Sequence, residues 1–444
     1  MPDATHTSPS TRRTPRPVTP APTPSEPGRP DDATSADAAT RASSGSSGRL
    51  TVLIAGDTFP PDVNGAANFT ERLAVGLARR GHDVHLMVPA ASRHHGTFLE
   101  QHGGVTLTVH RLYSTRWPLH DWLRFATPWR VQEHAEKIFD EIHPDVVHIQ
   151  SHIVMGRGVA QVAERRGVRI VATNHFMPEN LLEHTGLPKG LRAKATQMAW
   201  NDASKTFRKA AAITTPTQKA ATFLEKSVSV TGVLAVSCGI EAGHYTALDT
   251  RPETNRIVFV GRVTAEKQID VLLKAMTLLD PALGATLTIV GGGDLFKQLQ
   301  TTSRDLGLAD VVTFAGYLSD DELRHTLTES TVFAMPSIAE LQSIASLEAM
   351  ASGLPIVVAD AMALPHLVDE GENGYLFRPG DSRDLADKLT TVLTAPDDEY
   401  LAMRRASLKM IEGHDIERTL SVFESLYRGQ PVVPSTDAAS DRAH

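Results

Sequence analysis

Short apolar runs alternate with amphipathic stretches along most of the chain. The first run, residues 49–55, reads RLTVLIA and is typical of a strand buried in a parallel sheet. The stretch at 68–80 then places its apolar residues at helical spacing and is closed by Gly81. The same alternation predicts further strands at 83–88, 105–110, 146–150, 169–173, 212–215 and 232–236, and helices near 131–142, 156–166 and 218–226.

A second alternation begins with the apolar run at 256–260. It predicts strands at 285–290, 311–315, 331–335 and 355–359, with helices at 269–279, 295–306 and 320–329. We therefore predict an α/β fold of two Rossmann-like, doubly wound domains, whose loop-bearing sheet edges face a central cleft. The boundaries are expected at 49–243 for the first domain and 250–411 for the second.

The two ends of the chain have a different composition. Residues 1–48 are dominated by Pro, Ser, Thr, Ala and Asp with almost no large apolar side chain, and residues 431–444 are similar. Such segments cannot bury enough apolar surface to offset their ordering entropy, so we expect disordered tails.

Bulk properties narrow the class of protein. A net charge of −8 argues against nucleic acid as a partner, which usually requires a basic field. The single cysteine, Cys238, excludes an internal disulfide framework and a cysteine-based zinc cluster. No apolar run approaches the roughly twenty residues of a membrane-spanning helix, and the N-terminus lacks the apolar segment of a signal peptide. We therefore expect a cytoplasmic protein.

The stretch 331–360 carries two glutamates in a strand–turn–helix–strand unit. Glu340 lies in the turn and Glu348 in the helix, which Gly353 and Pro355 are expected to stop. The amides of residues 343–345 would form an anion site at the helix N-terminus, suited to a diphosphate. The carboxylates would then accept hydrogen bonds from sugar hydroxyls. The alternative is one capping glutamate and one that faces solvent.

A pair of cations follows another predicted strand. Gly261 ends the strand, and Arg262 and Lys267 are spaced so that both side chains can converge on one anion, such as a diphosphate leaving group. The alternative is two surface cations at the start of a helix. The run Gly291–Gly293 also follows a strand, but Phe296 stands where a dinucleotide-binding fingerprint requires its third glycine.

Turns in the first half carry further candidates. The loop at 64–67, NGAA, contains Gly65 and allows backbone amides to approach a phosphate or a sugar, although Asn is also an ordinary helix cap. His152 and His175 follow predicted strand ends, where a histidine can bind a hydroxyl or stabilise a charge. With nineteen histidines in the chain, a structural role is the alternative for each. Their spacing predicts no metal site.

Two segments combine aromatic and basic residues. Residues 114–130 hold three of the four tryptophans together with arginines, and residues 188–209 are basic. This composition suits an anionic membrane interface or a lipid-linked acceptor. Core aromatics with solvated charges are the alternative.

Together these motifs resemble the donor-site signature of retaining glycosyltransferases of family 4, which have the GT-B fold. The resemblance rests on Arg262 with Lys267, on the glycine turn at 291–293, and on Glu340 followed by the run at 348–353, EAMASG. It spans roughly residues 49–428, and it implies that the helix at 412–428 crosses back to the first domain.

The resemblance implies a nucleotide-sugar donor and a role for each matching residue. Glu348 would hold the ribose and Glu340 the transferred sugar, while Arg262 and Lys267 neutralise the diphosphate without a metal or other cofactor. His152 would lie near the reacting sugar. The implied donor-binding set is Gly65, Gly261, Arg262, Lys267, Gly292, Tyr317, Leu318, Glu340, Ser343, Ile344 and Glu348. The acceptor-side candidates are Asn174, His175 and Glu179.

One departure concerns Ser343, because many relatives carry glycine there; a serine can still cap the helix. The resulting hypothesis is a retaining transferase that moves a hexose from GDP-mannose or UDP-glucose to a lipid or glycan, forming an α-glycosidic bond. It would act in the cytoplasm, with peripheral contact to the anionic inner face of the plasma membrane. The alternatives are a glycan or disaccharide phosphorylase of the same fold and an inactive nucleotide-sugar-binding module.

Overall fold

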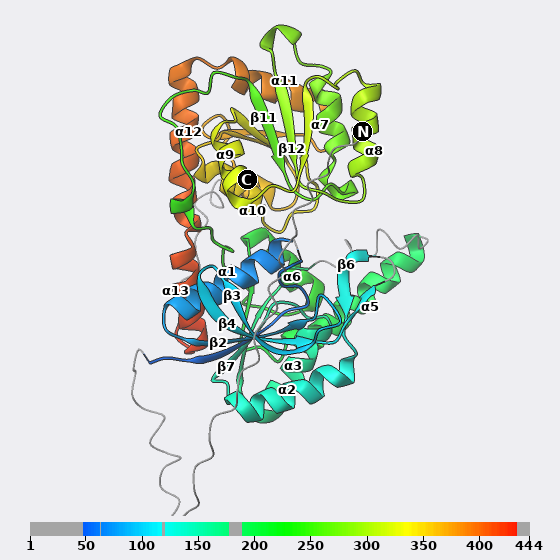
Figure 1. Ribbon diagram of the computed structural model, residues 1–444, viewed down its shortest axis with the longest axis vertical. Coiled ribbons are helices and arrows are strands. Elements are labelled where there is room, and N and C mark those ends of the chain that lie inside the picture. Colours follow the sequence, from blue (N-terminus) through cyan, green and yellow to red (C-terminus); the bar gives the residue numbers. More distant parts are fainter. Residues whose placement is uncertain (1–47, 63, 118–119, 177–188, 433–444) are drawn as a thin grey trace, which may run out of the picture. The chain divides into compact units, whose positions relative to one another are not determined.

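The computed structural model describes residues 48–62, 64–117, 120–176 and 189–432 (Figure 1). The predicted tails therefore lie outside the described residues, apart from Gly48 and residues 431–432. Two mainly parallel β-sheets with helices around them confirm the predicted α/β class.

The first sheet has eight strands in the order β10-β9-β8-β7-β1-β2-β4-β3. All neighbours pair in parallel except β3 and β4, which are antiparallel. The strands are β1 (Thr51–Ala55), β2 (Asp83–Pro89), β3 (Gly96–His102), β4 (Val105–Leu112), β7 (Val146–Ile149), β8 (Arg169–Thr173), β9 (Ala212–Thr215) and β10 (Leu234–Ala235).

Helices cover both faces of this sheet, which explains the continuous apolar runs. In β1, Leu53 and Ala55 join the core that includes α2 and α3, whereas Val52 and Ile54 join the core that includes α1 and α13. Because successive side chains of a strand point to opposite faces, the four consecutive buried positions 52–55 of β1 must all be apolar. The helices of this half are α1 (Gly65–Arg79), α2 (Pro128–Ile142), α3 (Val154–Arg166), α5 (Lys189–Phe207) and α6 (Gln218–Val228).

The second sheet has six parallel strands in the order β13-β12-β11-β14-β15-β16. They are β11 (Arg256–Val260), β12 (Thr286–Val290), β13 (Val312–Gly316), β14 (Val332–Met335), β15 (Ile356–Ala359) and β16 (Gly374–Phe377). The helices that follow them in the chain are α7 (Ile269–Met276), α8 (Phe296–Asp305), α9 (Asp320–Thr328), α10 (Ile344–Ala351), α11 (Ser382–Thr394) and α12 (Asp397–Ile411).

Strand order places a switch point in each sheet. The chain passes from β1 to β2 on one side and later returns to β7 on the other side of β1. In the second sheet β11 lies in the same way between β12 and β14. At such points the connections on the two sides diverge, so a crevice opens beyond the carboxyl ends of the strands, and ligands bind there.

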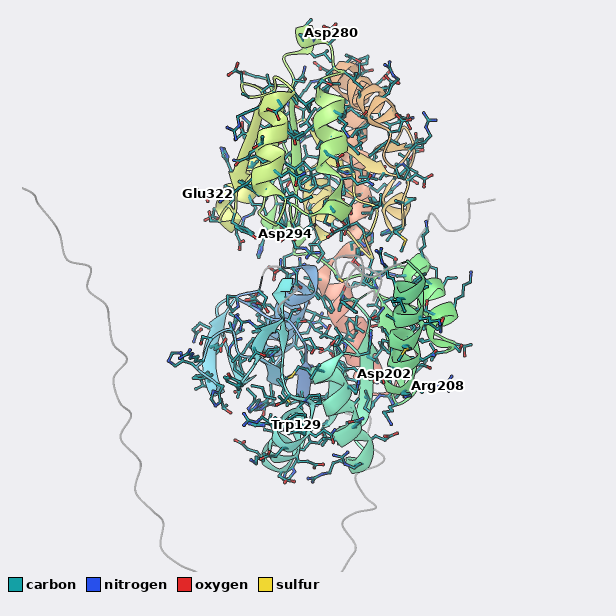
Figure 2. All side chains as sticks on the ribbon, turned by 90° about the vertical axis from the view of Figure 1, so that its right-hand side faces the viewer. Trp129, Asp202, Arg208, Asp280, Asp294 and Glu322 are labelled. Atoms are coloured by element: carbon teal, nitrogen blue, oxygen red, sulfur yellow. The ribbon has the colours of Figure 1, made fainter. Side chains whose placement is uncertain are left out.

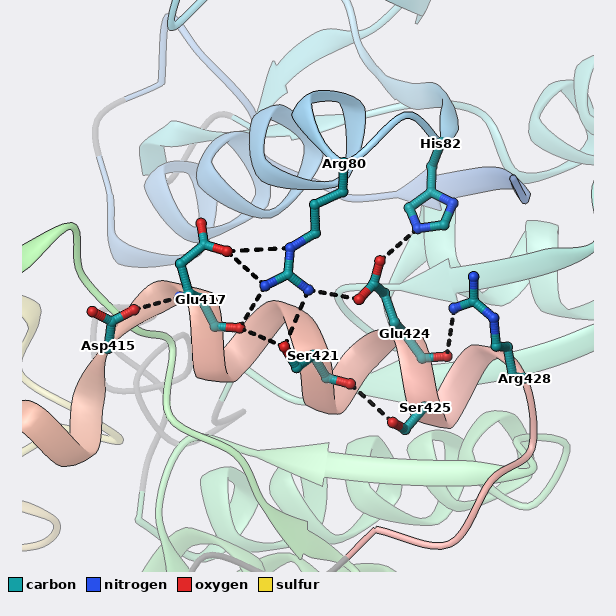
Figure 3. A network of polar contacts seen from close by, with 8 residues as sticks. All are labelled: Arg80, His82, Asp415, Glu417, Ser421, Glu424, Ser425 and Arg428. Carbon is teal, nitrogen blue, oxygen red and sulfur yellow. Dashed lines mark hydrogen bonds and ion pairs between the residues drawn. The ribbon is translucent and has the colours of Figure 1, made fainter. Parts of the chain in front are cut away.

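The final helix, α13 (Ile416–Tyr427), lies beside α1 and packs into the core of the first sheet (Figure 1). Gly76 of α1 permits this contact, because a Cβ there would lie 2.8 Å from Leu420 Cδ2. Figure 3 shows the polar side of the contact, where Arg80 donates to Glu417 and Glu424. His82 Nε2 lies 2.7 Å from the other oxygen of Glu424.

Strand β3, a short hairpin and helix α5 of the first half are absent from the sequence prediction. Strand β3 is mostly exposed, so it has no apolar run by which to recognise it. A short hairpin, β5 (Thr115–Trp117) and β6 (His120–Phe125), occupies part of the aromatic and basic segment 114–130. Across the described part of the chain, none of the helices combines the length and apolar character needed to cross a bilayer.

Candidate active site

A cavity of about 230 Å³ lies at the switch points of both sheets. From the first half it is lined by Asp57, which follows β1, and Gln150, which follows β7. From the second half it is lined by Arg262, which follows β11, and Glu340, which follows β14. The two crevices therefore form one polar cavity, with groups from all four strand ends.

The predicted cations of this cavity are paired with carboxylates. Lys267 Nζ forms an ion pair with Glu340, and these side chains are only 12% and 11% exposed. Arg262 Nη2 lies 3.2 Å from Glu266 Oε1, which also accepts a hydrogen bond of 2.7 Å from Thr264. Removal from water strengthens these pairings, so the site holds two cations in defined positions beside a carboxylate.

Both halves of the molecule fix the turn that carries Glu340. The Glu340 carbonyl accepts from the amide of Ala363 at 3.1 Å, within the second half. From the first half, Thr217 Oγ1 donates to the carbonyl of Leu341 at 3.1 Å, and the amide of Cys238 donates to Gln342 Oε1 at 2.8 Å. The position of the Glu340 carboxylate is therefore coupled to the first sheet.

Helix α10 begins directly after this turn. Ser343 is its N-cap and accepts from the amide of Ser346 at 3.3 Å, so serine serves here as the cap that the sequence predicts. Ile344 lines the cavity, and its Cδ1 would lie 3.8 Å from a Cβ at Gly65, the first residue of α1. Two helix N-termini, of α1 and α10, thus point their positive dipole ends toward the same cavity.

Glu348 lies one helical turn further along α10 and does not line the cavity itself. Burial raises the pKa of its carboxyl, while the Arg72 guanidinium and a hydrogen bond from Tyr245 act in the opposite direction. Arg72 belongs to α1, seven residues after Gly65, and therefore lies on the same helix face. Its Nε and Nη2 are buried and make no hydrogen bond within the described residues. Arg72 thus brings a cation from the first half toward the predicted ribose-binding glutamate.

His175 lines the cavity as an acceptor-side candidate should. Its Nε2 lies 2.9 Å from Gln150 Oε1, and its ring centroid lies 4.9 Å from that of Phe69. Burial lowers the pKa of His175 to about 4, so the imidazole is neutral at physiological pH. A neutral ring that donates to Gln150 keeps its other nitrogen as an acceptor for a hydroxyl.

His152 is placed differently from its predicted position beside the reacting sugar. It is not among the residues that line the cavity. Its ring lies in an aromatic cluster, with centroids 5.9 Å from Phe176, 6.0 Å from Trp200 and 5.4 Å from Phe207. Burial lowers its pKa to about 4. Phe176 does line the cavity, so His152 lies one aromatic ring behind its wall.

The remaining predicted donor residues form a layer beside the cavity. A Cβ at Gly291 would collide with the carbonyl oxygen of Gly261, so glycine is required where these two strand ends approach each other. A Cβ at Gly292 would lie 2.7 Å from the ring of Tyr317, which is 67% exposed. Gly261, Gly292, Tyr317, Leu318 and Ser343 are not lining residues.

The two remaining acceptor-side candidates add little to the cavity. Asn174 is buried and does not line the cavity, and its backbone amide donates to the carbonyl of Thr214 at 2.9 Å. Glu179 lies outside the described residues.

Asp57 is a polar lining residue that the sequence analysis did not select. It accepts from Ser151 Oγ and, at 3.0 Å, from the amide of Met155 in the first turn of α3. Burial raises its pKa, and these hydrogen bonds oppose the shift. Asp57 and Gln150 follow β1 and β7 directly, so the strand-end rule that selected the histidines would have found them.

His, Cys, Asp and Glu side chains form no cluster of three or more suited to a metal ion within residues 48–62, 64–117, 120–176 and 189–432.

Comparison with known proteins identifies two family models along the chain. Residues 63–242 match Glycosyltransferase Family 4, and residues 246–410 match Glycosyl transferases group 1. The GDP-mannose-dependent alpha-mannosyltransferase of Mycobacterium tuberculosis is 28% identical over 371 residues, which are 80% of this chain and 92% of that protein. The Arabidopsis thaliana sulfoquinovosyl transferase SQD2 is 35% identical over 145 residues, 32% of this chain. This match spans 27% of SQD2. The matches of this chain to two other relatives span 42% and 38% of the length of those proteins.

Solved structures share the fold over most of this chain. Sucrose-phosphate synthase from Thermosynechococcus elongatus superposes with a TM-score of 0.70 at 17% identity, covering 85% of this chain and 98% of that one. Anabaena HepE in complex with UDP-glucose superposes with a TM-score of 0.66 at 17% identity, covering 86% of this chain and all of the other. At this level of identity the likeness establishes the architecture.

Proposed function

The chain belongs to glycosyltransferase family 4 and has the GT-B fold, and we propose that it moves a hexose from a nucleotide sugar to a lipid or glycan acceptor with retention of configuration. The observation that carries this proposal is the Lys267–Glu340 pair beside Arg262, in one cavity at the switch points of both sheets. A donor that bears both a diphosphate and a sugar offers an anion to the cations and hydroxyls to the carboxylate.

The cations act on the leaving group. As the bond between the sugar and the diphosphate breaks, negative charge builds on the departing oxygen, and Arg262 and Lys267 are positioned to stabilise it. The helix dipole of α10 adds to this field. We propose that these groups serve the purpose that a divalent cation serves elsewhere, so that the reaction needs no metal or other cofactor.

The glutamates hold hydroxyl groups of the donor. Glu340 would orient the transferred hexose, and the ion pair with Lys267 holds this carboxylate in place. Glu348 would accept from the ribose diol, and Tyr245 and Arg72 favour its ionised form against the effect of burial. Such orientation lowers the entropic cost of reaching the transition state.

Same-face attack explains retention with these groups. The acceptor oxygen attacks the anomeric carbon on the side from which the diphosphate leaves, and the acceptor proton passes to an oxygen of the departing phosphate. Four carboxylates line the cavity, and three of them have partners: Glu340 pairs with Lys267, Glu266 with Thr264 and Arg262, and Asp57 with Ser151 and α3. The fourth, Asp294, is exposed to solvent. We propose that the donor phosphate acts as the base.

The proposed donors are GDP-mannose and UDP-glucose. A relative of this chain over 80% of its length is described as GDP-mannose-dependent, and a protein of the same fold was solved with UDP-glucose. We place the reaction at the cytoplasmic face of the plasma membrane, with a peripheral contact through the basic stretch that contains α5.

Two measurements test this function. In a thermal-shift screen of UDP-, GDP- and ADP-sugars, the true donor should raise the melting temperature of the protein, since a ligand that binds only the native state stabilises it. Release of the nucleoside diphosphate should then depend on an added acceptor. Phosphate-dependent cleavage of a glycoside, with no use of nucleotide sugars, would instead establish a phosphorylase.

A further inference from the structure

A second, larger cavity of about 880 Å³ lies between α5 and α6, outside the proposed donor site. Its lining comes from the two helices and the segments that directly follow them. Trp200 and Phe223 form an aromatic part of the lining, with ring centroids 5.8 Å apart.

The charged lining of this cavity is entirely cationic within the described residues. Arg192, Lys205, Arg208 and Lys226 contribute to it, and no carboxylate does. Lys205, Arg208 and Lys226 are exposed and form no ion pair within the described residues. Nearby carboxylates are engaged elsewhere: Asp202 pairs with Arg157, and Glu164 with Lys209. Figure 2 shows Asp202, which belongs to α5, and Arg208, which directly follows the last residue of this helix.

An aromatic wall separates this cavity from the proposed active site. Trp200 lines the cationic cavity and lies 6.0 Å from His152, ring to ring. His152 lies 5.9 Å from Phe176, which lines the donor cavity. Three rings in tilted contact therefore lie between the two cavities, which are neighbours in the fold.

We propose that the cavity between α5 and α6 binds a phosphate ester carried by the acceptor, as the anion subsite of acceptor binding. The inference rests on the proposed glycosyl transfer, because the subsite serves to orient an acceptor whose hydroxyl enters the neighbouring active site. The cations supply charge-assisted hydrogen bonds to the phosphate oxygens. The phosphate belongs either to a soluble ester or to a lipid headgroup, and the experiment separates these two sources.

The test compares two triple variants of equal charge. The cavity variant carries Lys205→Gln, Arg208→Gln and Lys226→Gln. The control variant carries Lys194→Gln, Lys219→Gln and Arg130→Gln, which remove three exposed cations that do not line the cavity. Both proteins should keep the melting temperature of the wild type, because all six side chains are exposed.

Binding is measured with glycerol 1-phosphate by calorimetry, and with vesicles of phosphatidylglycerol or of phosphatidylcholine by sedimentation. We expect the cavity variant to bind glycerol 1-phosphate or phosphatidylglycerol at least roughly tenfold more weakly than the wild type and the control. Loss of glycerol 1-phosphate binding identifies a soluble ester, whereas loss confined to phosphatidylglycerol vesicles identifies a lipid headgroup. Equal losses in both variants would show a general surface attraction and overturn the subsite, as would unchanged binding in the cavity variant or no binding of either probe.

The nucleotide-sugar assay distinguishes failure of this inference from failure of the proposed function. If the protein turns over a nucleotide sugar but the cavity variant binds both probes with unchanged affinity, the anion subsite is excluded and the transferase function stands. If a probe binds through the cavity but no nucleotide sugar is turned over, the cavity is a phosphate site without a role in glycosyl transfer. This outcome also overturns the inference.

Discussion

Lys267 and Glu340 form an ion pair across 73 positions of the chain, and both side chains are almost completely shielded from solvent. One lies after β11 and the other after β14, two strands that are neighbours in the sheet. The pair places a cation for the diphosphate directly beside a carboxylate for the sugar. We therefore expect loss of turnover when Glu340 is removed and loss of nucleotide affinity when Lys267 is removed.

Glu340→Ala should lower turnover of the donor by roughly an order of magnitude or more, because the transferred sugar loses the group that orients it. The protein should stay folded but with a lower melting temperature, because Lys267 loses its ion-pair partner in a largely shielded position. Initial rates and a thermal melt measure the two effects. Glu372→Ala, at an exposed position of the same half, is the control. Wild-type turnover in Glu340→Ala would remove this residue from the site.

Lys267→Ala should weaken the binding of the nucleoside diphosphate by roughly tenfold, because a charge-assisted contact to the phosphate is lost. Calorimetric titration with UDP and with GDP provides the measurement. Lys297→Ala removes an exposed lysine of α8 and should leave the affinity unchanged. An affinity of Lys267→Ala equal to that of the control would show that the diphosphate binds elsewhere.

Arg72→Gln should make nucleotide binding more dependent on pH. Burial raises the pKa of Glu348, and Arg72 opposes this shift, so its removal raises the pKa further. The ionised carboxylate that accepts from the ribose then forms only at higher pH, and the rising limb of the binding profile moves upward.

The same substitution should also change stability, with a defined sign. A carboxyl whose pKa is raised by folding costs stability as pH increases through that pKa. Arg72→Gln should therefore lower the melting temperature more at pH 7 than at pH 4. Arg405→Gln, at an exposed position of α12, is the matched control. A loss that is independent of pH would show that Arg72 acts only through packing.

Gly291→Ala should destabilise the protein by about 2 kcal/mol or more, because its Cβ would collide with the backbone of Gly261 and its φ of 119° disfavours other residues. The collision would also displace the strand end before Arg262, so nucleotide affinity should fall. Chemical denaturation measures the stability. Gly284→Ala is a matched control with a φ of 56° but no atom within 4 Å of the added carbon. Equal effects of the two substitutions would exclude the close approach as the cause.

The local pattern predicts which residues of the second half lie together at one edge of the sheet. Arg262, Lys267 and Glu340 follow apolar runs, and the carboxyl ends of parallel strands are where such groups act. The first half depends on strand order, which joins β1 to β7 across almost a hundred residues. Asp57 and Gln150 also follow strand ends, and this strand order brings them to the same cavity.

Other features depend on packing that the sequence does not display. His152 follows a strand end, as the prediction required, but Trp200 and Phe207 come from α5 and enclose it. In the sequence, Arg72 is an ordinary charged position of an amphipathic helix. Its interaction with Glu348, which Tyr245 also contacts, arises only from the packing of the second half. Strand β3 is exposed along most of its length, so no apolar pattern marks it.

The most direct test of the proposed transfer is an analysis of the products that the protein forms from the donor. The wild type, Glu340→Ala and Glu372→Ala would each be incubated with GDP-mannose or UDP-glucose and a cell-envelope lipid extract, and phosphorus NMR would follow the nucleotide. We expect the wild type and Glu372→Ala to release GDP or UDP together with an α-linked glycoside, and Glu340→Ala to release little. Release of neither nucleotide by the wild type, or formation of a β-linked product, would overturn the proposed retaining transfer.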